Sequence, residues 1–369
     1  MEDRKWNLGR REFAKTWAGA AALSAVPGGR ATVHPNPPGI KIATSARGNP
    51  ADEDLLFLQQ AGVEYVSLGA TPETANAESF IKMRERYESA GIKVYNIGSG
   101  VGPSGSLHNM PEVTLNLPGR DQKIEEYKQY LRYLGKAGIH YTTYAHMGNG
   151  IWSSGRATVR GASGRELDLA SPNRRGSWGG KTYSEPLSHG RVFTKEEIWE
   201  NYTYFIKQVA PVAEAAGVRI GIHPDDPPAP ILAGVPRCIF SNFEGYKRAM
   251  EIANSPNVGL CLCCGTWLEG GKELTGKDPE EMIRYFGAAK IWKIHFRNVS
   301  APLPHFVETF MDNGYYDMYK IMKALRDVNY DGIVIPDHIP AMAGTRSGLA
   351  YSIAYMRALR DRANREAKG

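Results

Sequence analysis

Residues 216–223, AGVRIGIH, contain the repeated unit from which the fold can be predicted. A glycine after a helical run favours the left-handed conformation that ends a helix, and the β-branched residue behind it favours a strand. The same Ala-Gly-(Val or Ile) junction occurs three times earlier, at residues 61–63, 90–92 and 137–139. Four such junctions indicate a chain in which helices and strands alternate.

Short apolar runs with high strand propensity recur between these junctions. Eight of them predict strands, at residues 40–43, 65–68, 94–97, 141–144, 219–222, 258–262, 291–294 and 332–335. Amphipathic stretches separate the runs, and the clearest begins where Thr194 and Glu197 have the spacing of a capping box. Eight strands that alternate with helices favour the α/β class, as a closed (β/α)8 TIM barrel.

Two segments do not follow the repeat. Residues 1–38 contain Arg10-Arg11 before a short apolar run, which resembles a twin-arginine signal peptide and linker, although a frayed amphipathic tail is the alternative. The remaining residues, 39–369, then form one barrel domain. Its insertion at about 148–192, after the fourth strand, shows no sustained period. We expect a long loop that closes over a site, and a surface insert without function is the alternative.

Charge and hydropathy restrict the partners. The chain has 369 residues and a formal net charge of +6, but its 45 Lys and Arg and its 39 Asp and Glu are interspersed. This pattern favours a small anionic ligand and argues against nucleic acid. No apolar run approaches the roughly 18 residues of a membrane span, so we expect no membrane association after processing. The export signal predicts a periplasmic or exported protein, or a cytoplasmic one if the signal does not function.

Metal-binding side chains stand at the ends of four consecutive predicted strands. Strands five to eight lead into His223, Cys263, His295 and Asp337. Catalytic groups of barrel enzymes lie at this end of the strands, because the loops converge there. Two imidazoles, a thiolate and a carboxylate suit Zn²⁺, Mn²⁺, Fe²⁺ or Co²⁺, and composition alone favours Zn²⁺. The sequence therefore predicts a divalent metal site at the mouth of the barrel.

The motifs around these residues resemble the mannonate dehydratase family, most specifically over residues 212–340. They are HPDDPP at 223–228, CCGT at 263–266, HFRNV at 295–299 and PDH at 336–338. The resemblance implies a xylose-isomerase-like barrel, Mn²⁺ bound at the same four ligand positions, and proton transfer by His338. It further implies a lyase of hexuronate catabolism, which dehydrates the sugar acid D-mannonate to 2-keto-3-deoxy-D-gluconate and water.

Further residues are candidates for catalysis or substrate binding. Beside His338, whose alternative role is to orient a ligand, we expect catalytic roles for Asp225, which otherwise forms an Asx-turn, and for Tyr351, which stands near the position of a family tyrosine. Candidate substrate-binding residues are Arg237, Arg297, His146, Trp152 and Trp267. Each arginine could grip the substrate carboxylate, and for Arg297 a salt bridge to an acidic residue of a neighbouring loop is the alternative.

Three acidic residues near the last helix, Glu308, Asp312 and Asp317, are expected to be solvated or to cap that helix. Lys293 should share a strand face with His295 and so face the inside of the barrel, where a residue of the barrel floor is the alternative to a role at the site.

Two other functions fit the same residues. A sugar isomerase or epimerase would use the same metal-binding barrel without losing water, and a non-catalytic exported sugar-binding protein would use the cavity alone. An endonuclease of similar fold is disfavoured, because the sequence lacks a basic stripe. The family resemblance is also compatible with a homo-oligomer.

Overall fold

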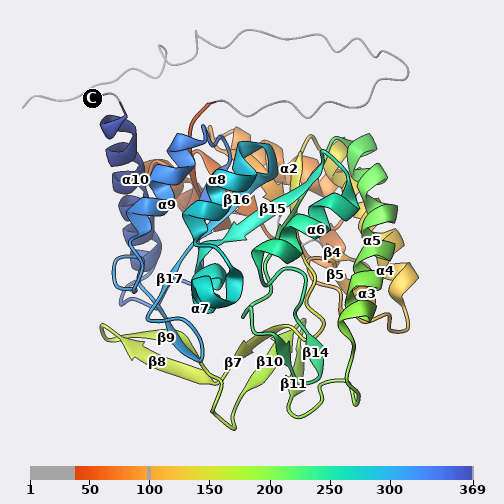
Figure 1. Ribbon diagram of the computed structural model, residues 1–369. Helices are drawn as coiled ribbons and strands as arrows, with labels where there is room; N and C mark the ends of the chain where they lie inside the picture. The colour runs from red at the N-terminus through yellow and green to blue at the C-terminus, as the bar shows by residue number, and fades with distance from the viewer. Residues whose placement is uncertain (1–37, 98–100, 368–369) are drawn as a thin grey trace, which may run out of the picture. The chain divides into compact units, whose positions relative to one another are not determined.

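Eight parallel strands form the centre of the computed structural model, which describes residues 38–97 and 101–367 (Figure 1). Their order is β3-β2-β1-β19-β16-β15-β12-β6. The strands are β1 (Lys41–Ala46), β2 (Tyr65–Leu68), β3 (Lys93–Ile97), β6 (Tyr141–Ala145), β12 (Arg219–His223), β15 (Val258–Cys263), β16 (Ile291–Phe296) and β19 (Ile333–Pro336). All eight predicted strands are confirmed, and each boundary differs from the prediction by no more than a few residues.

The sheet closes between its first and last strands. β3 and β6 lie next to each other without a continuous backbone ladder in the described residues. The hydroxyl of Tyr130 links them, since it donates to the carbonyl oxygen of Ile97 at 2.5 Å and lies 3.0 Å from Oγ1 of Thr142. This order, in which sequence neighbours pair and the ends meet, is that of a TIM barrel.

Helices surround the strands on the outside (Figure 1). They are α1 (Asp52–Gln60), η1 (Pro72–Thr74), α2 (Ala77–Glu88), α3 (Pro111–Thr114), α4 (Arg120–Lys136), α5 (Lys195–Ala216), α6 (Phe243–Ala253), α7 (Cys264–Thr275), α8 (Pro279–Lys290), α9 (Met318–Asp327) and α10 (Ser347–Glu366). The predicted capping box is present, because Thr194 accepts from the backbone N–H of Glu197 at 3.1 Å. Gly217 ends the same helix with a φ of 65°.

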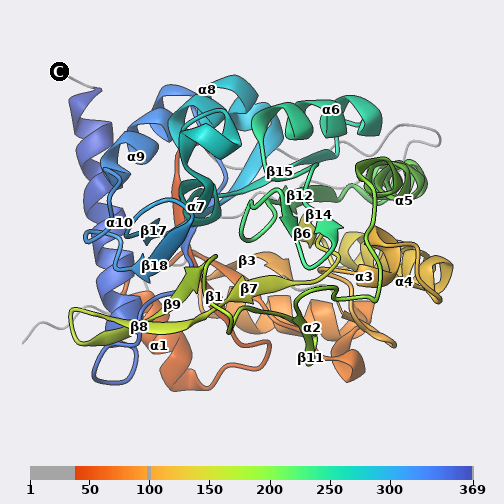
Figure 2. The same ribbon diagram turned by 60° about the horizontal axis from the view of Figure 1, so that its bottom comes forward.

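The insertion after β6 is not the irregular loop that the sequence predicts. It contains β7 (Ile151–Ser153), β8 (Gly155–Val159), β9 (Ala162–Asp168), β10 (Arg175–Trp178) and β11 (Lys181–Ser184). β10 pairs with β7 and β11, whereas β8 and β9 form a sheet with β17 (Asn298–Val299) and β18 (His305–Thr309). Figure 2 shows β7, β8 and β9 lying across the end of the molecule that is turned forward.

Two short hairpins complete the described elements. They are β4 (Val101–Gly102) with β5 (Gly105–Ser106), and β13 (Ile231–Leu232) with β14 (Val235–Pro236). No helix within residues 38–97 and 101–367 is long and apolar enough to cross a membrane. The segment that resembles a twin-arginine signal lies outside the described residues.

Candidate metal centre and cavity

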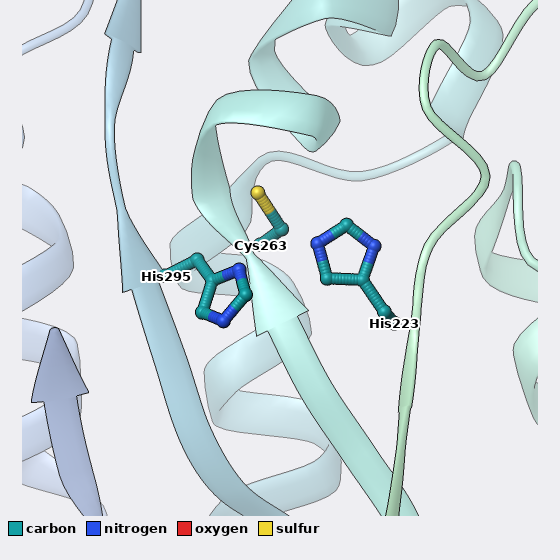
Figure 3. Close-up of side chains that lie close together, drawn as sticks. All are labelled: His223, Cys263 and His295. Atoms are coloured by element: carbon teal, nitrogen blue, oxygen red, sulfur yellow. The ribbon is translucent and has the colours of Figure 1, made fainter. Parts of the chain in front are cut away.

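Three of the four predicted ligands meet at the carboxyl ends of the barrel strands (Figure 3). His223 ends β12, Cys263 ends β15, and His295 lies on β16 in register with Cys263. One nitrogen of each histidine and the sulfur lie within 4.8 Å of one another. Figure 3 shows the cysteine sulfur and the two rings directed into one space, so that the three residues can hold one metal ion.

The fourth predicted ligand lies beside this group. Asp337 follows β19 directly, with Oδ2 3.5 Å from Sγ of Cys263 and Oδ1 3.6 Å from Nδ1 of His295. Its position completes a set of two nitrogens, one sulfur and one oxygen. Such a mixed donor set is typical of transition-metal sites rather than of Mg²⁺ or Ca²⁺ sites.

The hydrogen bonds of the histidines fit metal binding. Both ring nitrogens of His295 are buried and lack a partner, which is costly unless another group binds there. Nδ1 of His223 lies 2.7 Å from the carbonyl oxygen of Pro224. Nδ1 therefore donates its proton to that carbonyl, which leaves Nε2 free as a ligand.

Burial keeps both imidazoles neutral. It lowers the pKa of His295 well below its usual range and also lowers the pKa of His223, and neutral imidazole is the form that binds metals. Burial raises the pKa of Cys263 well above its ordinary value. A divalent cation would reverse that shift, because cysteine coordinates as the thiolate.

A cavity of about 420 Å³ opens at this group of residues. Its wall includes the predicted ligands His223, His295 and Asp337, together with His338. Trp178, from the insertion, also lines it. The inserted strands therefore contribute to the wall of the cavity. This volume suits a small polar molecule such as a six-carbon acid.

His338 occupies a strained position beside the cavity. Its φ of 44° lies in the left-handed region, which is rare for residues other than glycine and asparagine. Nδ1 lies 2.5 Å from Oε1 of Glu308, and Nε2 lies 3.9 Å from Oδ1 of Asp337. The charge of Asp337 raises the pKa of His338. The ring can therefore carry a proton at the cavity wall.

A buried ionic network lies behind His338, and the sequence did not predict it. Arg297 contacts Glu269 at 2.6 Å, Glu308 at 2.7 Å and Asp337 at 3.0 Å. Arg165, on the inserted strand β9, contacts the same Glu269 at 2.6 Å and the same Glu308 at 2.7 Å. The expectation that Glu308 is solvated is wrong, because its side chain is 4% exposed.

The two arginines predicted to bind the substrate are already engaged. The guanidinium of Arg297 is saturated by the ionic network, and its side chain is 1% exposed. Arg237 donates to the carbonyl oxygens of Asp226 and Gly150 and to Oδ1 of Asn149. Neither lines the cavity. For Arg297 the structure therefore supports the alternative, a salt bridge to neighbouring acidic residues. Arg237 instead holds the backbone of two loops.

Three more predicted substrate-binding residues are packed into the core. Trp152 is fully buried and donates its indole N–H to Asn149, and Trp267 donates to the carbonyl oxygen of Lys277. Nδ1 of His146 lies 2.8 Å from the hydroxyl of Tyr144. The structure does not place Trp152, Trp267 or His146 in the cavity wall. Trp152 and Trp267 pack in the core here instead of meeting a ligand.

Two predicted catalytic residues also lie away from the cavity wall. Asp225 is buried without reaching the wall, whereas Asp226, next along the chain, does line it. Tyr351, on α10, packs against Phe310 with ring centroids 6.0 Å apart and does not reach the wall either. Of the three predicted catalytic residues, the structure brings only His338 to the cavity.

Comparison with known proteins assigns the family. The family model of D-mannonate dehydratase (UxuA) matches residues 48–167 and 181–368. The chain belongs to the mannonate dehydratase family. The mannonate dehydratase of Thermotoga neapolitana is 32% identical over 316 residues, which cover 76% of this chain and 82% of that protein. Mannonate dehydratase 2 of Halalkalibacterium halodurans is 31% identical over 268 residues, which cover 67% and 76%.

Solved structures support the family and its fold. The crystal structure of mannonate dehydratase from Streptococcus suis serotype 2 has a TM-score of 0.73 at 25% identity, over 89% of this chain and 96% of that one. A xylose isomerase domain protein from Planctomyces limnophilus shares the fold at a TM-score of 0.58 and 15% identity, over 89% and 99%. The expected family and the expected xylose-isomerase-like barrel are thus confirmed.

Proposed function

We propose that this protein is a hydro-lyase that converts D-mannonate to 2-keto-3-deoxy-D-gluconate and water with one divalent metal ion. The observation that carries the proposal is the meeting of His223, Cys263 and His295, with Asp337 beside them. This group adjoins a cavity that His338 also lines, in a chain that belongs to this family. The relatives named above carry the same activity in their names.

The reaction removes the proton on C2, beside the carboxylate, and the hydroxyl on C3. The hydroxyl leaves as water once it gains a proton, and the resulting enol then takes a proton at C3 to become the ketone. A divalent cation at the four ligands would stabilise negative charge that develops on the carboxylate and the neighbouring oxygen.

We assign proton transfer to His338. Glu308 holds Nδ1, and Nε2 is left to exchange a proton with the substrate. Glu308 is itself fixed by Arg165 and Arg297. The ring is therefore held in one orientation before the substrate arrives, which lowers the cost of reaching the reactive geometry.

Mn²⁺ is the metal that we propose, on the basis of the family resemblance. The mixed nitrogen, sulfur and oxygen ligands would also accept Zn²⁺, Fe²⁺ or Co²⁺. Reconstitution of chelated protein with each ion separately, followed by assay, distinguishes them. Highest turnover with Zn²⁺ would contradict the assignment of Mn²⁺.

The test of the reaction is an assay with D-mannonate in D₂O, followed by NMR. We expect 2-keto-3-deoxy-D-gluconate with deuterium at C3, because the enol takes its last proton from the solvent. Protein treated with a chelator should give no product, and activity should return with Mn²⁺. An isomerised or epimerised acid without the keto-deoxy product would support an isomerase instead, and binding without turnover would support a sugar-binding protein.

We also propose export by the twin-arginine route, from Arg10-Arg11 and the apolar run behind them. Fractionation of cells that produce the full chain should place it outside the cytoplasm. Replacement of both arginines by lysine should retain it in the cytoplasm, and an unchanged distribution would contradict the proposal.

A further inference from the structure

The cavity wall contains a buried cation that the metal site does not use. Lys293 lies on β16, two residues before His295, and is only 4% exposed. Because side chains of a strand alternate between faces, Lys293 and His295 point to the same side. Both line the cavity, and Lys293 is the only lysine or arginine of the described residues in that wall.

The ammonium group of Lys293 has few partners. Its hydrogen bond to Oγ of Ser67 is long, at 3.4 Å. Asp337, whose charge reaches it, is already hydrogen-bonded to Arg297 at 3.0 Å. An ammonium has three donors, and a buried charge is costly unless it is paired. Lys293 therefore has donors to offer to a molecule in the cavity.

Lys41, another buried lysine of the barrel, forms short hydrogen bonds to the protein. Nζ of Lys41, on β1, donates to the carbonyl oxygen of Gly39 at 2.8 Å and to that of Asp331 at 2.7 Å. Lys41 does not line the cavity. A buried lysine of this barrel can therefore form short hydrogen bonds to protein oxygens, and Lys293 forms none within the described part of the chain because of its position at the cavity.

We infer that Lys293 binds the carboxylate of the substrate. This contact makes the enzyme bind sugar acids more tightly than neutral polyols. Its Cα should lie about 6.6 Å from that of His295, twice the rise per residue of a strand. A carboxylate can therefore lie between the ammonium and the group of metal ligands. Arg297 is already saturated, and neither Arg297 nor Arg237 lines the cavity, so they cannot take this role.

This inference rests on the proposed function for the identity of the acid, but its test does not depend on turnover. The test uses protein loaded with Mn²⁺ in which H338N slows the reaction, with and without K293M. Methionine is similar in length to lysine, and replacing a buried charge by an apolar group of similar volume is often tolerated. Calorimetry measures the affinity for D-mannonate, and elemental analysis measures the metal content.

We expect K293M to weaken binding of D-mannonate by about 10- to 100-fold, the range for loss of a charged hydrogen-bond partner. The metal content should be unchanged, and K41M in the same background should bind as tightly as its parent. Affinity within about twofold of the parent, loss of the metal in K293M, or no binding of D-mannonate by the H338N protein would each overturn the inference.

The assay with D-mannonate separates this inference from the proposed function. If the unsubstituted protein gives no keto-deoxy product, and K293M still weakens binding of the acid, the function fails and the anion site stands. If dehydration occurs and K293M leaves the affinity and KM unchanged, the anion site fails and the function stands.

Discussion

Nδ1 of His338 lies 2.5 Å from Oε1 of Glu308. This contact joins the residue that follows the predicted ligand Asp337 to strand β18, which pairs with β9 of the insertion. The carboxylate fixes both the orientation of the ring and the nitrogen that carries the proton. It can do so because Arg165 and Arg297 hold it in place.

We predict that E308Q lowers kcat by about 10- to 100-fold with little change in KM, as is typical when a group that orients a catalytic residue is replaced. Glutamine keeps the volume but can present an N–H to Nδ1 and stabilise the wrong tautomer. Steady-state kinetics with D-mannonate measures the effect. The matched control is E166Q, because Glu166 pairs with the exposed His305 on the same sheet at 2.8 Å. Equal losses in both variants would contradict a specific role for Glu308.

For His338 itself, H338N should lower kcat by about 10²- to 10⁴-fold, the usual contribution of a general acid or base. Asparagine accepts the φ of 44° better than other residues except glycine, so the backbone that carries Asp337 should be preserved. The metal content of the variant should equal that of the unsubstituted protein. Turnover near the original rate would exclude His338 from proton transfer.

The sequence was sufficient to predict the barrel because its signals are local. Each glycine junction and each apolar run depends on residues close together in the chain, and strand ends meet at one mouth in any closed parallel barrel. For this reason the positions of His223, Cys263 and His295 could be used to predict that they meet.

The ionic network could not be predicted in the same way. Arg165, Glu269 and Glu308 come from three distant segments, and only the pairing of β9 with β18 brings two of them together. Without those partners, the sequence leaves open whether Arg297 binds a substrate carboxylate or an acidic residue of a neighbouring loop.

The network makes a prediction about stability. R297M should lower the free energy of unfolding by about 3–5 kcal/mol, because it leaves Glu269 and Glu308 buried with less positive charge. Urea denaturation measures the change. R160M, which removes an exposed pair with Asp312, is the control and should leave the midpoint nearly unchanged. A midpoint for R297M that matches the control would contradict this account of the network.

A helix remote from the cavity provides a prediction about the fold alone. T194A removes the side chain that caps α5 and should cost about 1 kcal/mol of stability. The metal content and KM should not change, because Thr194 does not line the cavity. A change in either would show that the helix start is coupled to the site.

The most direct test of the central claim is the metal content of purified protein, measured by elemental analysis for the unsubstituted chain and for C263A and H295A. We predict about one transition-metal ion per chain in the unsubstituted protein and almost none in either variant, with each variant still folded. Unsubstituted protein that is active without metal, or variants that retain a full equivalent, would contradict it.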